Sequence, residues 1–70
     1  MNTDTIEALR TATKALAWVA YIHARNVDPH AGEGYMCDVA AINDFTRDEL
    51  LDYINAVVAD INETTGRHRQ

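Results

Sequence analysis

Apolar residues in the first part of the chain recur at the spacing of one helix face, which predicts a helix over about residues 4–25. Asp4 is expected to cap its start, with Glu7 three residues later as the second member of a capping box. Asn26 suits the left-handed position that follows a helix, and Pro29 cannot continue one. These signals together predict where the first helix ends.

The last third of the chain repeats this periodicity and predicts a helix over about residues 47–64. Thr46 and Glu49 have the spacing of a capping box, and Gly66 is expected to end the helix. The opposite side of this helix is polar, so we expect one of its sides to face water. The apolar positions are Leu50, Leu51, Ile54, Val57, Val58 and Ile61.

The segment between the two helices contains the single proline and two of the three glycines. We expect a loop over residues 26–37 and a short helix over about 38–43, capped by Asp38. The resulting fold class is all-α, in a single small domain over residues 1–70. The two long helices are expected to form an antiparallel hairpin, with the short helix or turn between them.

The apolar side of the first helix is wider than one neighbouring helix covers, because it spans an arc of roughly 220°. Domains below about 70–80 residues rarely bury enough apolar surface alone, and eleven of the apolar residues here are alanines. We therefore predict a homodimer that forms a four-helix bundle. The alternative is that the middle segment covers the spare surface. The predicted dimer interface comprises Ala8, Leu9, Ala12, Ala15, Leu16, Val19, Ile22 and His23.

Charge and compartment signals narrow the partner classes. Six basic residues against eleven acidic residues give a net charge of −5, which argues against direct DNA binding. The longest apolar run, residues 15–22, is too short to cross a membrane, and the first four residues lack the basic region of a secretory signal. The single cysteine, Cys37, cannot form an internal disulfide. We expect a cytoplasmic protein.

Trp18 fits the amphipathic pattern of the first helix worst, because it falls among polar positions. Together with Tyr21, Lys14 and Arg25 it forms a candidate partner-binding patch, since Trp, Tyr and Arg are enriched at interface hot spots. The alternative is structural: the two cations lie along the rings, or the loop after Pro29 covers the tryptophan.

A second candidate surface is acidic. Asp44, Asp48 and Asp52 lie near the start of the last helix. A row of carboxylates can bind a basic protein surface that normally holds nucleic acid. The alternative is ordinary solvation together with a favourable position at the positive end of the helix dipole.

Metal and catalytic chemistry find little support. His23, His30, Cys37 and Asp28 include zinc-ligand types, but their spacing matches no common zinc pattern. A nucleophile–base pair of Cys37 and His30 lacks an evident oxyanion site, and no phosphate-binding glycine motif is present. We expect no catalytic residue, no metal and no cofactor.

These features predict a non-enzymatic binding protein that occupies a surface of another protein or a protein–RNA complex. Small size, acidity and the lack of a catalytic constellation are the general profile of phage inhibitors of host nucleic-acid machinery, including anti-CRISPR proteins. This is an analogy between classes, since no family motif is present. The alternative is a structural or adaptor dimer in which Trp18 and Tyr21 grip an apolar groove.

Overall fold

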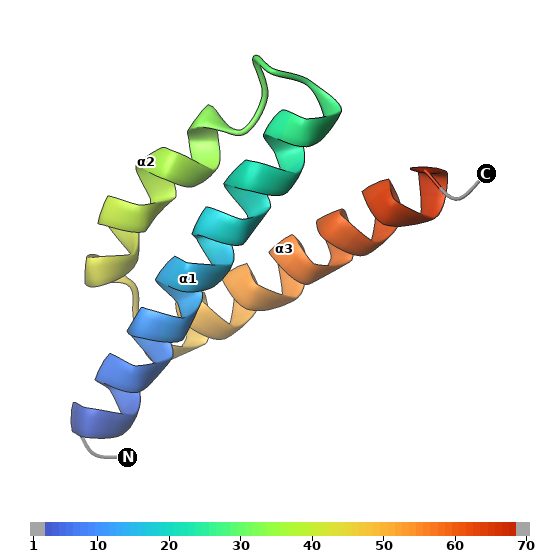
Figure 1. The fold of residues 1–70 in the computed structure, drawn as a ribbon. Helices are drawn as coiled ribbons and strands as arrows, with labels where there is room; N and C mark the ends of the chain where they lie inside the picture. The colour runs from blue at the N-terminus through green and yellow to red at the C-terminus, as the bar shows by residue number, and fades with distance from the viewer. Residues whose placement is uncertain (1–2, 69–70) are drawn as a thin grey trace.

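The computed structural model describes residues 3–68 and is helical throughout, apart from short connections. Three α-helices, α1 (Thr3–Val27), α2 (Glu33–Ala41) and α3 (Arg47–His68), follow one another, with the 3-10 turn η1 (Ile42–Asp44) between the last two (Figure 1). The predicted all-α class is confirmed. α1 packs against both α2 and α3.

The direction of the helices differs from the predicted antiparallel hairpin, which is wrong. α1 and α3 run in the same direction, and α2, which connects them in the sequence, runs back along the other side of α1 (Figure 1). The side chain of Arg10, near the start of α1, donates a hydrogen bond to the carbonyl of Phe45, just before α3 (3.4 Å). The reason is that α2 and η1 carry the chain back along α1, so α3 begins beside the first part of α1.

Gly32 explains why the middle segment departs from prediction. It adopts φ 95° immediately before α2, and a Cβ there would lie 3.0 Å from the carbonyl oxygen of Tyr21. This close approach and left-handed backbone suit glycine. Helix α2 therefore begins at Glu33, so the loop predicted over 26–37 and the helix predicted over 38–43 are both wrong in their bounds. Asp38, the predicted cap, lies inside α2.

The end of α1 also differs in detail. Asn26 remains helical, and no residue other than glycine has positive φ in the described part of the chain, so its predicted left-handed role is wrong. The amide of Asp28 still donates to the carbonyl of Ala24 (2.9 Å), one turn back. Pro29 follows directly, and the helical hydrogen bonding stops there.

The predicted start of α3 is confirmed, whereas its predicted end is wrong. The amide of Thr46 donates to Oε1 of Glu49 (3.2 Å), and the amide of Glu49 donates to Oγ1 of Thr46 (3.3 Å). Gly66 lies within the helix, which continues to His68 rather than stopping near residue 64. A Cβ at Gly66 would meet nothing within 4 Å, so no neighbouring element forces a turn there.

The core is small and lies where the three helices meet. Ala17, Ile42 and Leu50 form its fully buried cluster, which Phe45 borders. Thr13 is also fully buried, and its hydroxyl donates to the carbonyl of Leu9 (2.7 Å), which satisfies the buried oxygen. Few large side chains are thus shielded from water by one chain.

The molecule is thin and elongated. Its extents are 43 × 21 × 14 Å, and its radius of gyration is 12.9 Å, against about 11 Å for a compact chain of this length. α3 diverges from α1 towards its C-terminal end (Figure 1). No helix in the described part of the chain is long and apolar enough to cross a membrane.

Candidate functional site

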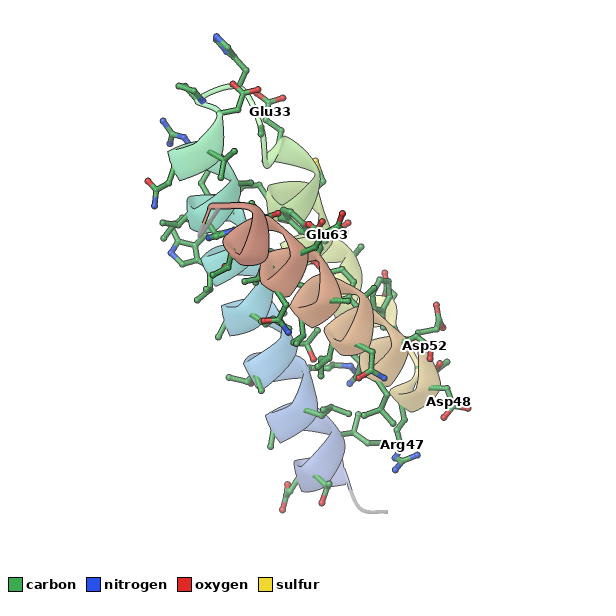
Figure 2. All side chains as sticks on the ribbon, turned by 90° about the vertical axis from the view of Figure 1, so that its right-hand side faces the viewer. Glu33, Arg47, Asp48, Asp52 and Glu63 are labelled. Carbon is green, nitrogen blue, oxygen red and sulfur yellow. The ribbon has the colours of Figure 1, made fainter. Side chains whose placement is uncertain are left out.

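Carboxylates gather along one side of α3. At about 100° per residue, the acidic side chains of α3 fall within an arc of roughly 120°. Figure 2 shows Asp48 and Asp52 projecting from α3 on the side away from α1. Asp44 of η1, which precedes them, is exposed as well. We define the acidic face as Asp44, Asp48, Glu49, Asp52, Asp60 and Glu63.

Little positive charge reaches the first turn of the acidic face. The guanidinium of Arg47 lies 3.8 Å from the carboxylate of Asp48, whose side chain is 91% exposed. An ion pair this exposed is screened by water and contributes little. Arg10 is directed to the carbonyl of Phe45, and its Nε is buried without a partner. The negative charge of Asp44, Asp48 and Asp52 therefore stays exposed to a partner.

Two tyrosine–aspartate hydrogen bonds tie α2 to α3. The hydroxyl of Tyr35 donates to Asp60, and the hydroxyl of Tyr53 donates to Asp38 (3.1 Å). The hydrogen bond to Asp60, followed by partial burial, raises the pKa of Tyr35 to about 12. Burial, followed by the hydrogen bond to Asp38, raises the pKa of Tyr53. Neither pair could be predicted from the sequence, because the members lie 25 and 15 residues apart without a local signal.

The aromatic patch is assembled as its spacing on one helix suggests. The rings of Trp18 and Tyr21 have centroids 5.6 Å apart at 34°. Nη1 of Arg25 donates to the hydroxyl of Tyr21 (3.1 Å), and its guanidinium carbon lies 5.6 Å from the Tyr21 ring centroid. Trp18 remains 48% exposed, so the loop after Pro29 does not enclose it. We call Trp18, Tyr21 and Arg25 the aromatic corner; Lys14 is partly buried on the same helix.

The predicted dimer interface divides into two groups. Leu9, Leu16 and His23 are partly buried by the chain itself. The other five predicted residues are exposed, with Val19 at 55% and Ile22 at 46%. The middle segment covers a different side of α1, because Gly32 packs at Tyr21. We define the α1 stripe as the exposed group, Ala8, Ala12, Ala15, Val19 and Ile22.

A cavity of about 190 Å³ lies between the C-terminal halves of α1 and α3. Its lining includes His23, Val27, Tyr35, Ile61 and Thr64. Nε2 of His23 is buried there without a hydrogen-bond partner. The His23 side chain therefore faces this cavity and is not part of the α1 stripe.

Of the residues considered for metal binding, Asp28 forms another contact, and His30 and Cys37 are exposed. The carboxylate of Asp28 accepts a hydrogen bond from the amide of His30 (3.0 Å), and Cys37 is exposed. Within the described residues, no three His, Cys, Asp or Glu side chains gather closely enough to hold a metal ion. Comparison with protein-family models, curated proteins and solved structures finds no match. Any function must be argued from the surfaces themselves.

Proposed function

We propose that the protein is a non-enzymatic binding module that docks its acidic face onto a basic, nucleic-acid-binding surface of another protein or protein–RNA complex, and so blocks that surface. The observation that carries the proposal is the row of exposed carboxylates along α3. From Asp48 to Glu63 this row extends about 22 Å, at about 1.5 Å per residue. Arginine forks and lysines bind carboxylates as they bind phosphates, so such a row competes with nucleic acid.

The distribution of charge supports this choice of face. Residues 35–66 hold seven acidic residues and one basic residue, whereas α1 holds two acidic and three basic residues. A one-sided field accelerates encounter with a basic partner and orients the molecule during approach. By analogy of size and charge, we propose that the protein inhibits its target as phage anti-defence or anti-CRISPR proteins do.

The test measures binding to an immobilised arginine-rich peptide. The double variant Asp48→Lys/Asp52→Lys should weaken affinity by about tenfold or more, because each reversal replaces attraction by repulsion. The matched control, Asp4→Lys/Glu7→Lys, changes the net charge equally on α1 and should have a much smaller effect. Equal losses in the two variants would contradict docking through the acidic face.

Homodimerisation through α1 is the second part of the proposal. Its support is the exposed α1 stripe, which gives apolar side chains such as Val19 (55% exposed) no cover within the chain. A second copy would bury this stripe, while the acidic face on α3 stays outside the contact. A single-chain mass in solution at micromolar concentration would contradict this part.

The aromatic corner supports an alternative function as an adaptor that binds an apolar groove. Its support is that Trp18 remains 48% exposed although it packs on Tyr21, which leaves a large aromatic surface open to a partner. In that case Trp18→Ala should abolish partner binding while circular dichroism shows unchanged helicity. The Asp48→Lys/Asp52→Lys variant should then bind as the original does.

A further inference from the structure

We infer that the α1 stripe is an antiparallel seam for a second copy of this chain, in which Ala12 lies opposite Ile22 of the second copy and Ala15 lies opposite Val19. The inference rests on the dimer part of the proposed function and is independent of the acidic face. It adds the direction and the register of the pairing. Three features of α1 lead to it.

The first feature is the spacing of the exposed residues. Positions 8, 12, 15, 19 and 22 alternate steps of four and three, which is the repeat of about 3.5 residues that forms the seam of a coiled coil. The buried side of α1 is marked by Thr13, Ala17 and Ala20 and already packs within the chain. The seam-like spacing therefore lies on the side of α1 that its own chain leaves uncovered.

The second feature is the order of side-chain sizes. The first three residues of the α1 stripe are alanines, and the last two are Val19 and Ile22. In a parallel pair alanine would face alanine at one end, leaving voids, and Ile22 would meet its own copy at the other. In the antiparallel register each alanine meets a larger side chain, so the layers have similar volume. Asn26 then follows opposite Ala8.

The third feature is the charge along α1. Asp4 lies in its first turn and Arg25 in its last turn. Antiparallel pairing brings the acidic start of one helix towards the basic end of the other, and it also opposes the two helix dipoles. Asp48 and Asp52 of the acidic face project from the side of α3 away from α1 (Figure 2). Two copies can therefore meet along α1 without bringing Asp48 and Asp52 of one copy against those of the other.

The thin, elongated shape of the chain leaves extra surface exposed. The chain exposes 4920 Å², whereas a compact monomer of its mass exposes about 4,400 Å². This surplus of about 500 Å² reflects the elongated shape of the whole molecule, and a stable interface buries roughly 800 Å² per partner. Val58 of α3, 42% exposed, lies roughly 140° around its helix from Tyr53, which bonds to α2. Val58 is therefore an exposed apolar residue on the side of α3 away from α2.

The first test is the solution mass at micromolar concentration, by light scattering or sedimentation equilibrium. The original chain should have twice the 7.8 kDa mass of one chain. Ala15→Glu should halve the measured mass, because it places a carboxylate within the seam, while helicity is kept because Ala15 is exposed. The matched control is Ala40→Glu, at an exposed position of α2, which should stay dimeric. A dimeric Ala15→Glu variant would overturn the seam.

The second test fixes the direction by cross-linking. In a Cys37→Ser background, the variant Ala12→Cys/Ile22→Cys should oxidise to a covalent dimer whose disulfides join position 12 to position 22, as peptide mass spectrometry would show. Links of 12 to 12 or 22 to 22 would overturn the antiparallel register and leave the dimer standing. A monomeric original chain would overturn both, without bearing on the acidic face.

Discussion

The two long helices differ in what they leave to solvent. α1 exposes the α1 stripe and the aromatic corner, whereas α3 exposes the acidic face. The difference follows from their apolar arcs: that of α1 is too wide for α2 and α3 to cover, while that of α3 is used almost completely by the core, apart from Val58. Apolar surplus and charge surplus are thus separated on different helices, and the two kinds of contact proposed here are separable by mutation.

The largest expected effect is on the free energy of unfolding, and it differs between a buried residue of α3 and a residue of the α1 stripe. Leu50→Ala should lower the free energy of unfolding by about 3 kcal/mol, because Leu50 is fully buried in the core. Val19→Ala should cost far less at low protein concentration and more at concentrations at which the chain dimerises. Urea denaturation followed by circular dichroism at two concentrations measures both. A loss in Val19→Ala that does not depend on concentration would remove the distinction between the two surfaces.

The next largest effect is that of salt, which should weaken binding through the acidic face and leave dimerisation through the α1 stripe unchanged. Raising the salt concentration from about 0.05 to 0.5 M should weaken binding of the acidic face to an arginine-rich peptide by about tenfold, since screening acts on exposed charges. The dimer should persist over the same range, because its seam is apolar. Binding measurements and solution mass, taken in the same buffers, make the comparison. An affinity for the peptide that salt leaves unchanged would contradict electrostatic docking.

The tyrosine–aspartate pairs supply a smaller effect with a defined pH dependence. Tyr35→Phe should cost about 1 kcal/mol through loss of its hydrogen bond to Asp60. The pKa of Tyr35 is raised from 10 to about 12 in the folded chain, so its contribution is full below pH 10 and is lost as the pH rises towards 12. Denaturation at a series of alkaline pH values should show the two proteins converging. A constant difference up to pH 12 would be inconsistent with this bond.

The smallest effect concerns the end of α3. Gly66→Ala should stabilise the chain by about 0.5 kcal/mol, because alanine is the better helix former and the added methyl group meets nothing within 4 Å. Had Gly66 occupied the left-handed position expected from the sequence, the same change would destabilise it. Thermal denaturation gives the sign directly, and Gly34→Ala in α2, where a Cβ also meets nothing, serves as a comparison.

Features that depend on neighbouring residues could be predicted from the sequence. The capping box of Thr46 and Glu49 is one, because both members and their hydrogen bonds lie within one turn. The aromatic corner is another, since positions three and four apart on a helix adjoin. The exposure of the α1 stripe followed from the width of its apolar arc.

Features that depend on distant contacts could not be predicted. The start of α2 is set by the approach of Gly32 to the carbonyl of Tyr21, eleven positions away in the sequence. The direction of α3 depends in turn on how far α2 returns along α1. The bond from Tyr35 to Asp60 joins helices whose pairing no local pattern announces. The start of α2, the direction of α3 and this hydrogen bond all depend on tertiary packing, which no local sequence pattern indicates.

The position of Asp48 and Asp52, on the side of α3 away from α1 (Figure 2), affects how long a dimer would stay bound to its target. Two copies joined along α1 would carry two acidic faces, one on the α3 of each copy. Once one copy is bound, the other would be held at high effective concentration near any second basic site. Release would then require both contacts to open together. The pair would leave a target that offers repeated basic sites far more slowly than a single copy.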